Sequence, residues 1–283
     1  MKSLISPLGV LFLLLYCLAV AILLAQSDRR LLVMGLLNTV MVAVGILLTF
    51  RLTEGWALPT AGVRRPWLGL VLWLLVVGLV SLYLFLNIRW LHWQILGLDV
   101  GDAVVGKLLL TVALPLLLLW VKGDSLAGMG LNLRNCPQNL GLALLLACLL
   151  VGFLLPFRWG VIEQAGWQQV GLGFALGFTY NLFQTGFPEE FFFRAYLQGH
   201  LAVLFRSRFD AVLLASLIFG LLHILWRLDM GFPMAFALSM LQETVRGLLY
   251  GVVWERTRSL IAPTILHATT NAILGLHHFV ERV

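Results

Sequence analysis

Two adjacent carboxylates and an arginine stand in an otherwise apolar stretch, Phe187-Pro188-Glu189-Glu190-Phe191-Phe192-Phe193-Arg194. Only 11% of the residues are charged, and a charged group at membrane depth costs roughly 2.5–3.5 kcal/mol, so such groups indicate a function. Glu189 and Glu190 point about 100° apart on a helix, which predicts separate roles. Glu190 and Arg194 have the spacing of an intrahelical ion pair, which predicts that Glu189 is the carboxylate without an ion-pair partner and is available for chemistry. The alternative is a structural ion network of all three.

A histidine follows in the next apolar stretch, as Phe219-x-x-x-His223. The helix from Glu189 to Phe205 would be about 24 Å long, and the helix from Asp210 back to His223 about 20 Å. Two antiparallel helices joined by a short loop would therefore bring Glu189 and His223 to nearly the same depth. The alternative for His223 is a packed, hydrogen-bonded structural residue.

A second histidine and an asparagine, His267 and Asn271, share one face of the last predicted helix. Their alternative role is hydrogen bonding between membrane helices. Together with Glu189 and His223 they supply one carboxylate, two imidazoles and an amide, which suffice to activate a water and to stabilise an oxyanion. Glu189, His223 and His267 would also make a zinc set. We favour the metal-free chemistry, because His-Glu-x-x-His is absent and Asn271 is a poor zinc ligand.

Three further ionisable sites lie in apolar stretches. Lys107 lies close to the end of a predicted helix and is expected to extend its ammonium to the membrane surface. His200 follows Glu189 on about the same helical face; it could contact substrate, but we favour a polar residue near a helix end. Glu243 and Arg246 have the spacing of a buried ion pair.

The elements that must position these residues are membrane helices. The chain is 61% hydrophobic with a mean hydropathy of +0.97, whereas a soluble domain carries about a quarter charged residues. The sequence predicts an all-α, polytopic integral membrane protein, a bundle of about eight to nine transmembrane helices in the lipid bilayer. The predicted helices are 4–25, 31–50, 67–88, 104–121, 139–156, 171–205 with an interruption at Pro188, 210–226, 232–255 and 260–280.

The polar connector at 134–138 divides the chain into an N-terminal part, residues 1–135, and a catalytic part, residues 136–283. Ionisable residues lie in the connections of the first part and in the helices of the second. The net charge of +6 comes from Lys and Arg scattered over many loops, which indicates contacts with anionic lipid or the cytoplasm and no nucleic-acid partner.

The motifs Glu-Glu-x-x-x-Arg, Phe-x-x-x-His and His-x-x-x-Asn occur in this order within about 85 residues. They resemble the three motifs of the CPBP family, which comprises CAAX prenyl endopeptidases and bacteriocin-processing or immunity proteins, also called the Abi family. The resemblance covers roughly residues 170–275. It implies an intramembrane endopeptidase on a peptide or membrane-protein substrate, with a prenylated CAAX-type substrate as one option. With the metal-free chemistry favoured above, the enzyme would be a glutamate endopeptidase that needs no cofactor.

The resemblance also implies roles for the residues that match the motifs. Glu189 and His223 would activate the attacking water, and His267 and Asn271 would stabilise the oxyanion. Three residues would shape and neutralise the site: Glu190, Arg194 and Phe219.

Two functions of other classes compete with proteolysis. The first is a non-catalytic scaffold or immunity protein on the same fold, which would have no need of a glutamate level with a histidine. The second is a transporter or proton-relay protein, in which buried Glu and His are also expected. Repeated broken helices, which such transporters carry in both halves, are not apparent in the sequence.

Overall fold

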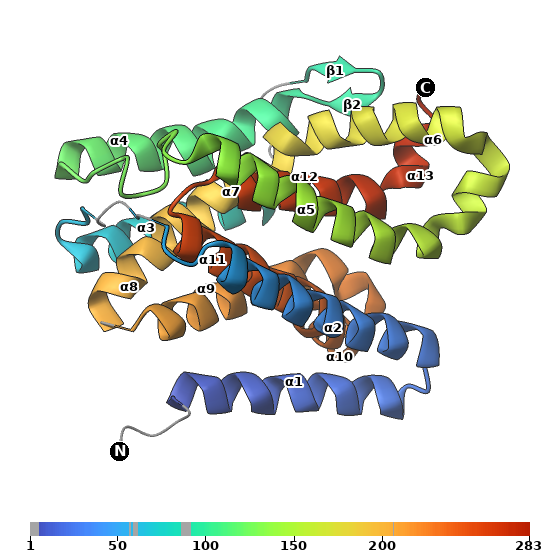
Figure 1. Ribbon diagram of the computed structural model, residues 1–283, viewed down its shortest axis with the longest axis horizontal. Helices are drawn as coiled ribbons and strands as arrows, with labels where there is room; N and C mark the ends of the chain where they lie inside the picture. The colour runs from blue at the N-terminus through green and yellow to red at the C-terminus, as the bar shows by residue number, and fades with distance from the viewer. Residues whose placement is uncertain (1–5, 57, 59–61, 86–91, 206) are drawn as a thin grey trace. The chain divides into compact units, whose positions relative to one another are not determined.

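The computed structural model describes residues 6–56, 58, 62–85, 92–205 and 207–283 (Figure 1). Helices make up nearly all of that part, and its strands form one short antiparallel pair. The helical runs long and apolar enough to cross a membrane are Pro7–Ala25, Arg29–Leu52, Gly101–Lys122, Cys136–Phe205 and Arg208–Met230. The predicted all-α, polytopic membrane bundle is confirmed, and the chain is an integral membrane protein. The number of spans stays a prediction.

The longest run, Cys136–Phe205, has 70 residues. At 1.5 Å per residue it would measure about 105 Å, more than three times the roughly 30 Å of a hydrocarbon core. It therefore has to fold back on itself. The 3₁₀ turn Leu155–Arg158 separates α5 (Cys136–Leu154) from α6 (Trp159–Asn181), and Gly166 bends α6 with a φ of 78°.

The chain forms two compact units, and each unit combines two separate stretches of the sequence. The first unit comprises the described residues within 1–57 and 201–257, and the second those within 58–200 and 258–283. Glu189, Glu190, Arg194, His267 and Asn271 all belong to the second unit. The predicted division of the chain at 135/136 stays a prediction.

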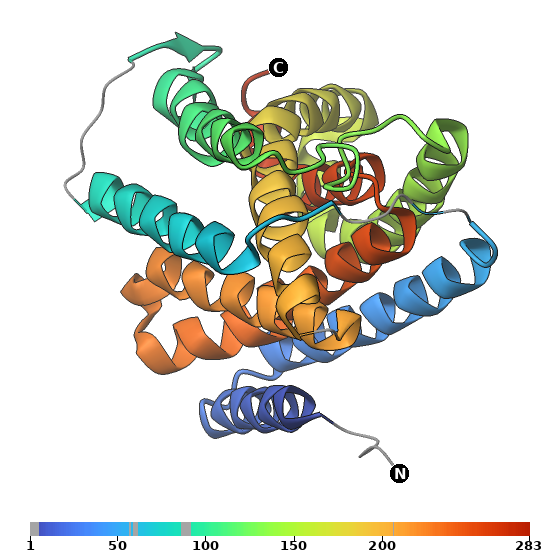
Figure 2. The same cartoon turned by 90° about the vertical axis from the view of Figure 1, so that its left-hand side faces the viewer.

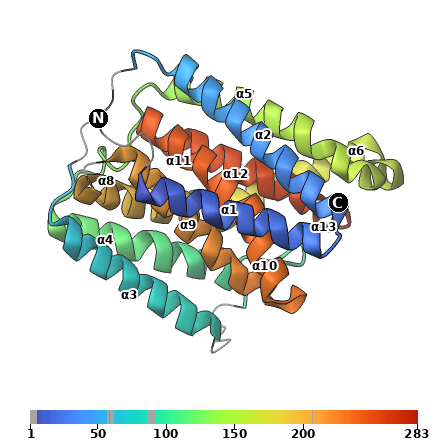
Figure 3. The same ribbon diagram turned by 90° about the horizontal axis from the view of Figure 1, so that it is seen from below.

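In the first unit, α11 (Val245–Thr257) packs against α2 (Arg29–Leu52) and α9 (Arg208–Leu222), as Figure 3 shows for α2. Asn38 on α2 donates a hydrogen bond of 2.9 Å to the carbonyl of Leu241. Arg256 on α11 donates one of 3.0 Å to Thr53 Oγ1. The remaining elements of this unit are α1 (Pro7–Ala25), the 3₁₀ segment His223–Met230, α10 (Phe232–Leu238) and the π-helical segment Ser239–Thr244.

In the second unit, α12 (Ile261–Leu274) packs against α5 and α6, and α13 (Leu276–Val280) packs against α6. Figure 1 shows α12 and α13 between the two arms that α5 and α6 form. This packing places the predicted His267–Asn271 face inside the unit. The α6 run continues through the π-helical segment Leu182–Gly186, α7 (Phe187–Glu190), the π-helical segment Phe191–Gln198 and α8 (Gly199–Phe205).

A short hairpin precedes the helical run Gly101–Lys122 of the second unit (Figure 2). Its strands β1 (Gln94–Ile95) and β2 (Leu98–Asp99) pair with Gln94 opposite Asp99. The helical run contains two π-helical segments, Gly101–Gly106 and Leu109–Ala113, before α4 (Leu114–Lys122). The other helix of this part, α3 (Pro66–Phe85), packs against α4 and the Phe191–Gln198 segment.

Several predicted boundaries were wrong. The residues between 156 and 171 are helical, since the polar residues there lie on the exposed face of α6. Pro188 does not interrupt its helix, because it occupies the first turn of α7 behind a π-helical turn, where its missing N–H costs little. The α-helix predicted at 210–226 ends at Leu222 and continues as a 3₁₀ segment, and Gly275 divides the last predicted helix. The predicted helix ends at 4–5 and 86–88 lie outside the described residues.

Gly220 allows α9 to approach the π-helical segment Ser239–Thr244 closely. A Cβ atom at Gly220 would lie 1.8 Å from Thr244 Oγ1 and 2.9 Å from the Thr244 backbone nitrogen. Gly220→Ala is therefore expected to lower the free energy of unfolding by about 1–3 kcal/mol. Detergent-solubilised protein titrated with SDS would measure this loss. Gly141→Ala on α5 is the matched control, since nothing lies within 4 Å of a Cβ there; an equal loss in both variants would contradict the prediction.

Candidate active site

The two carboxylates of the predicted motif lie on α7, the short α-helical turn between two π-helical segments. α7 packs against α12 and against the segment Leu109–Ala113 of the preceding helical run. A π-helical turn is wider than an α-helical one and is frequent at functional sites. Glu189 and Glu190 both contact α12 through His267, and Glu189 also contacts the preceding helical run through Lys107.

Glu190 forms the ion pair that its spacing predicts. Its Oε2 accepts a hydrogen bond of 3.0 Å from Arg194 Nε, and both side chains are completely buried. Its Oε1 lies 2.8 Å from His267 Nδ1. Because an ionised carboxylate can only accept, His267 donates from Nδ1 and turns its Nε2 edge away from Glu190. The predicted pair is confirmed, and its second contact orients the imidazole.

Glu189 lies on the other side of the same imidazole. Its Oε2 is 3.8 Å from His267 Nε2, and its Oε1 accepts a hydrogen bond from the ammonium of Lys107. Two sequence predictions are therefore wrong: Glu189 is ion-paired, and Lys107 does not extend to the membrane surface. The sequence places Lys107 near a helix end, but it does not show which helix packs beside it.

The four charged groups and His267 form a continuous series. Lys107 contacts Glu189, the two carboxylates flank His267, and Glu190 contacts Arg194. Two cations thus balance two anions around one imidazole. Such a balance reduces the cost of keeping charge in a water-poor interior, where an isolated ion is strongly destabilised.

Asn271 lies one helical turn after His267 on α12. Its amide nitrogen donates a hydrogen bond of 2.9 Å to Thr185 Oγ1, and Thr185 in turn donates to the carbonyl of Asn181 at 3.2 Å. Sequence reasoning missed Thr185 and Asn181. Their signal was a polar pair four residues apart in an apolar helix, the same signal that identified His267 and Asn271.

His223 and Phe219 lie in the first unit, so the position of His223 relative to Glu189 stays a prediction. His223 is the first residue after α9, and its Nδ1 lies 2.7 Å from the carbonyl of Phe219. The two rings also pack together, with centroids 4.6 Å apart. Phe219 therefore fixes the orientation of the His223 ring from both its backbone and its side chain.

The predicted ion pair of Glu243 and Arg246 is confirmed in the first unit. Arg246 Nη2 lies 2.6 Å from Glu243 Oε2, and Arg227 Nη2 lies 2.6 Å from the other carboxylate oxygen. Arg227 is an addition that the sequence did not reveal, because it lies on the separate 3₁₀ segment.

His200 is completely buried in α8, near the end of its helical run, as the favoured prediction of a polar residue near a helix end has it. Its Nδ1 donates to the carbonyl of Tyr196 at 2.7 Å, and its Nε2 lies 2.7 Å from Lys122 Nζ. Lys122 also pairs with Asp124 at 2.8 Å. These contacts tie the end of α4 to the helix that carries α7.

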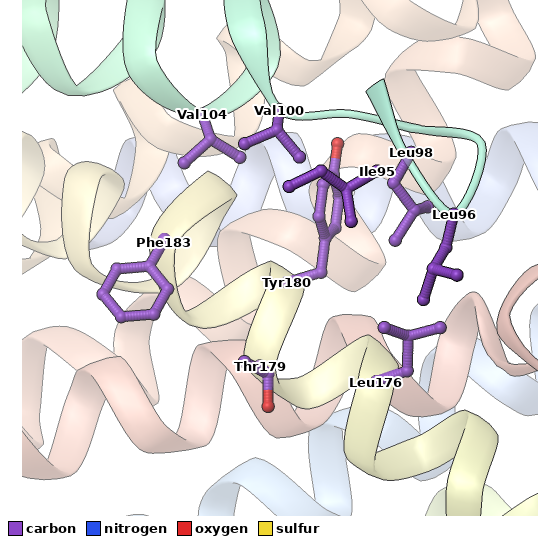
Figure 4. Close-up of a pocket in the computed structure, with 9 residues that line it drawn as sticks. All are labelled: Ile95, Leu96, Leu98, Val100, Val104, Leu176, Thr179, Tyr180 and Phe183. Carbon is purple, nitrogen blue, oxygen red and sulfur yellow. The ribbon is translucent and has the colours of Figure 1, made fainter. Parts of the chain in front are cut away.

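An apolar cavity of about 190 Å³ opens where the hairpin meets α6 (Figure 4). The two polar side chains among its lining residues are already hydrogen-bonded: Tyr180 donates to the Asp99 carbonyl and Thr179 to the Ala175 carbonyl. A cavity of about 150 Å³ holds one benzene molecule, so this one has room for a single side chain. The lining residues are Ile95, Leu96, Leu98, Val100, Val104, Leu176, Thr179, Tyr180 and Phe183.

Zinc was the alternative chemistry for Glu189, His223 and His267. In the part of the chain that the structure describes, no three His, Cys, Asp or Glu side chains gather as a metal site would require. Zinc at Glu189, His223 and His267 stays untested, because His223 lies in the other unit. The polar series around His267 offers a carboxylate, an imidazole edge and an amide on two packed helices. These groups can take a proton from a water and donate hydrogen bonds to a developing oxyanion.

A family model described as Rce1-like, type II CAAX prenyl endopeptidase, matches residues 171–273. The match contains all three predicted motifs and lies within the predicted catalytic part, and it confirms the resemblance. No curated protein and no solved structure matches the chain significantly. Over residues 171–273, the chain is therefore similar to the Rce1-like type II CAAX prenyl endopeptidases, a family of membrane proteases.

Proposed function

We propose that the protein is an intramembrane endopeptidase that hydrolyses a peptide bond of a membrane-associated substrate. The observation that carries the proposal is the meeting of Glu189 and His267, which come from separate helices and lie 3.8 Å apart at Oε2 and Nε2. Glu190 contacts His267 at Nδ1, and Arg194 forms an ion pair with Glu190. A purely structural pair of Glu190 and His267 would not need a second carboxylate, that of Glu189, near the Nε2 atom of the imidazole.

The proposed reaction uses Glu189 as the general base. Glu189, with His223, takes a proton from a water as the water oxygen attacks the scissile carbonyl carbon. In the proposed step His267 is an imidazolium, because its Nδ1 already donates to Glu190 and a second N–H is needed at Nε2. His267 Nε2 and Asn271 donate hydrogen bonds to the oxyanion that forms; Asn271 has two N–H donors, and Thr185 takes one of them. As the C–N bond breaks, Glu189 passes the proton to the leaving amine. The products are one new carboxyl terminus and one new amino terminus.

The substrate class follows from the setting of the site. The carboxylates lie within a helical run apolar enough to cross a membrane, so the scissile bond has to reach membrane depth. A peptide with a hydrophobic anchor meets that condition, and a prenylated CAAX-type peptide is the substrate that the matched family name indicates. We therefore propose a lipid-anchored or membrane-spanning peptide as substrate.

The proposal is tested with purified protein in detergent and a library of membrane-associated peptides, half of them prenylated CAAX peptides. Mass spectrometry of the products would locate the cleaved bond. Glu189→Ala, His223→Ala and His267→Ala are each expected to abolish cleavage. Full retention of cleavage by Glu189→Ala would refute the mechanism, and binding without cleavage by the wild type would favour a non-catalytic scaffold.

Removal of metal ions tests the zinc alternative. Because the proposed base and oxyanion donors are protein side chains, cleavage by the wild type is expected to be unchanged after incubation with a strong chelator. The measurement compares initial rates before and after chelation, with zinc added back in a third sample. A rate that falls on chelation and returns with zinc would contradict the metal-free mechanism.

A further inference from the structure

Lys107 is a cation at the proposed general base that none of the three motifs contains. Its ammonium donates a hydrogen bond to Glu189 Oε1, while Glu189 Oε2 faces His267. The two oxygens of one carboxylate are thus in different surroundings. A carboxylate held at one oxygen has little rotational freedom left at the other.

The backbone on both sides of this ion pair is unusual. Lys107 lies between the π-helical segments Gly101–Gly106 and Leu109–Ala113, and Glu189 lies between Leu182–Gly186 and Phe191–Gln198. The segment Leu109–Ala113 packs against α7 and against the π-helical segment that follows α7. π-helical turns are rare and are frequent at functional sites. Two such turns next to Lys107 and two next to Glu189 therefore indicate a functional site.

A second lysine of the same helical run shows what a structural ion pair looks like in this protein. Lys122 pairs with Asp124, and the two side chains are 3% and 0% exposed. The Lys107 and Glu189 side chains are 24% and 13% exposed. The two lysines therefore differ in setting, although both contact a carboxylate.

We propose that Lys107 is a positioning residue for catalysis, an inference that rests on the proposed endopeptidase function. The ammonium holds Glu189 Oε1 and stabilises the carboxylate form that a general base requires in a water-poor interior. It thereby aims Glu189 Oε2 at the space beside His267, where the attacking water has to be. Loss of the cation should impair the chemical step and leave substrate binding nearly intact.

Lys107→Met is expected to lower kcat by about 10- to 100-fold with little change in KM, the size of effect that a misplaced catalytic group produces. Lys107→Arg, which keeps the charge, should retain most of the activity. Lys122→Met is the matched control: it should lower the SDS midpoint of unfolding and leave kcat per folded molecule unchanged. An unchanged kcat in Lys107→Met, or a loss that only follows the folded fraction, would overturn the proposal.

Chemical rescue separates the charge from the shape of the side chain. Lys107→Cys should be nearly inactive, and alkylation with 2-bromoethylamine, which restores an ammonium at the same chain length, should return at least about tenfold in kcat. Alkylation with iodoacetamide adds a neutral group and should not. The wild type, treated in the same way, corrects for Cys17, Cys136 and Cys148. Equal results with both reagents would overturn the proposal, whereas a wild type without any cleavage would refute the endopeptidase function itself.

Discussion

Glu189→Gln is expected to reduce peptide cleavage by about 10²–10⁴-fold, the contribution typical of a positioned general base. Glutamine has nearly the volume of glutamate, and its amide oxygen can still accept the hydrogen bond from Lys107. The fold should therefore persist while the proton acceptor is lost. The measurement is kcat on the best peptide of the library, with the SDS midpoint of unfolding as the check on folding.

The matched control for this variant is Glu163→Gln. Glu163 lies on α6 of the same unit, is exposed, and accepts a hydrogen bond from Trp159 Nε1. Its substitution should leave kcat and stability unchanged. If Glu189→Gln also retained wild-type kcat, Glu189 would not be the base.

Arg194→Met is expected to destabilise the second unit by about 3–5 kcal/mol, the cost of leaving one partner of a buried ion pair uncompensated. Both Arg194 and Glu190 are completely buried, so water cannot replace the lost guanidinium. The contact of Glu190 with His267 would remain, but one imidazole N–H does not balance a full negative charge in such surroundings. The SDS midpoint of unfolding and the yield of folded protein measure the loss.

The double variant Glu190→Gln with Arg194→Met tests the cause of that loss. Removing both charges leaves no uncompensated ion, so most of the stability should return. His267 would still have an amide oxygen as acceptor. If the double variant were as unstable as Arg194→Met alone, packing of the long arginine side chain would be the cause instead of charge.

Helices and contacts within one helix could be predicted from the sequence, because they depend on spacing alone. The apolar runs predicted the membrane helices, and a separation of four residues predicted the pair of Glu190 with Arg194. The separation of three residues likewise predicted Glu243 with Arg246. In each case the chain itself fixes the distance between the two groups.

Contacts between helices could not be predicted in the same way. Lys107 and Glu189 are far apart in sequence, and nothing in the local pattern shows that the helical run Gly101–Lys122 packs beside α7. The π-helical turns also escaped prediction, since they depend on hydrogen bonds to the fifth residue and have no clear residue pattern. These turns lie on both sides of Lys107 and of Glu189.

If the chain hydrolyses a peptide bond with Glu189 as the base, one oxygen atom of the solvent water enters the new carboxyl group. The most direct measurement incubates the wild type and Glu189→Gln with a prenylated CAAX peptide in water enriched in ¹⁸O and analyses the products by mass spectrometry. With the wild type we expect a shortened peptide that carries ¹⁸O in its new carboxyl group, and with Glu189→Gln almost none. An intact peptide with the wild type, or equal labelling with both proteins, would contradict this expectation.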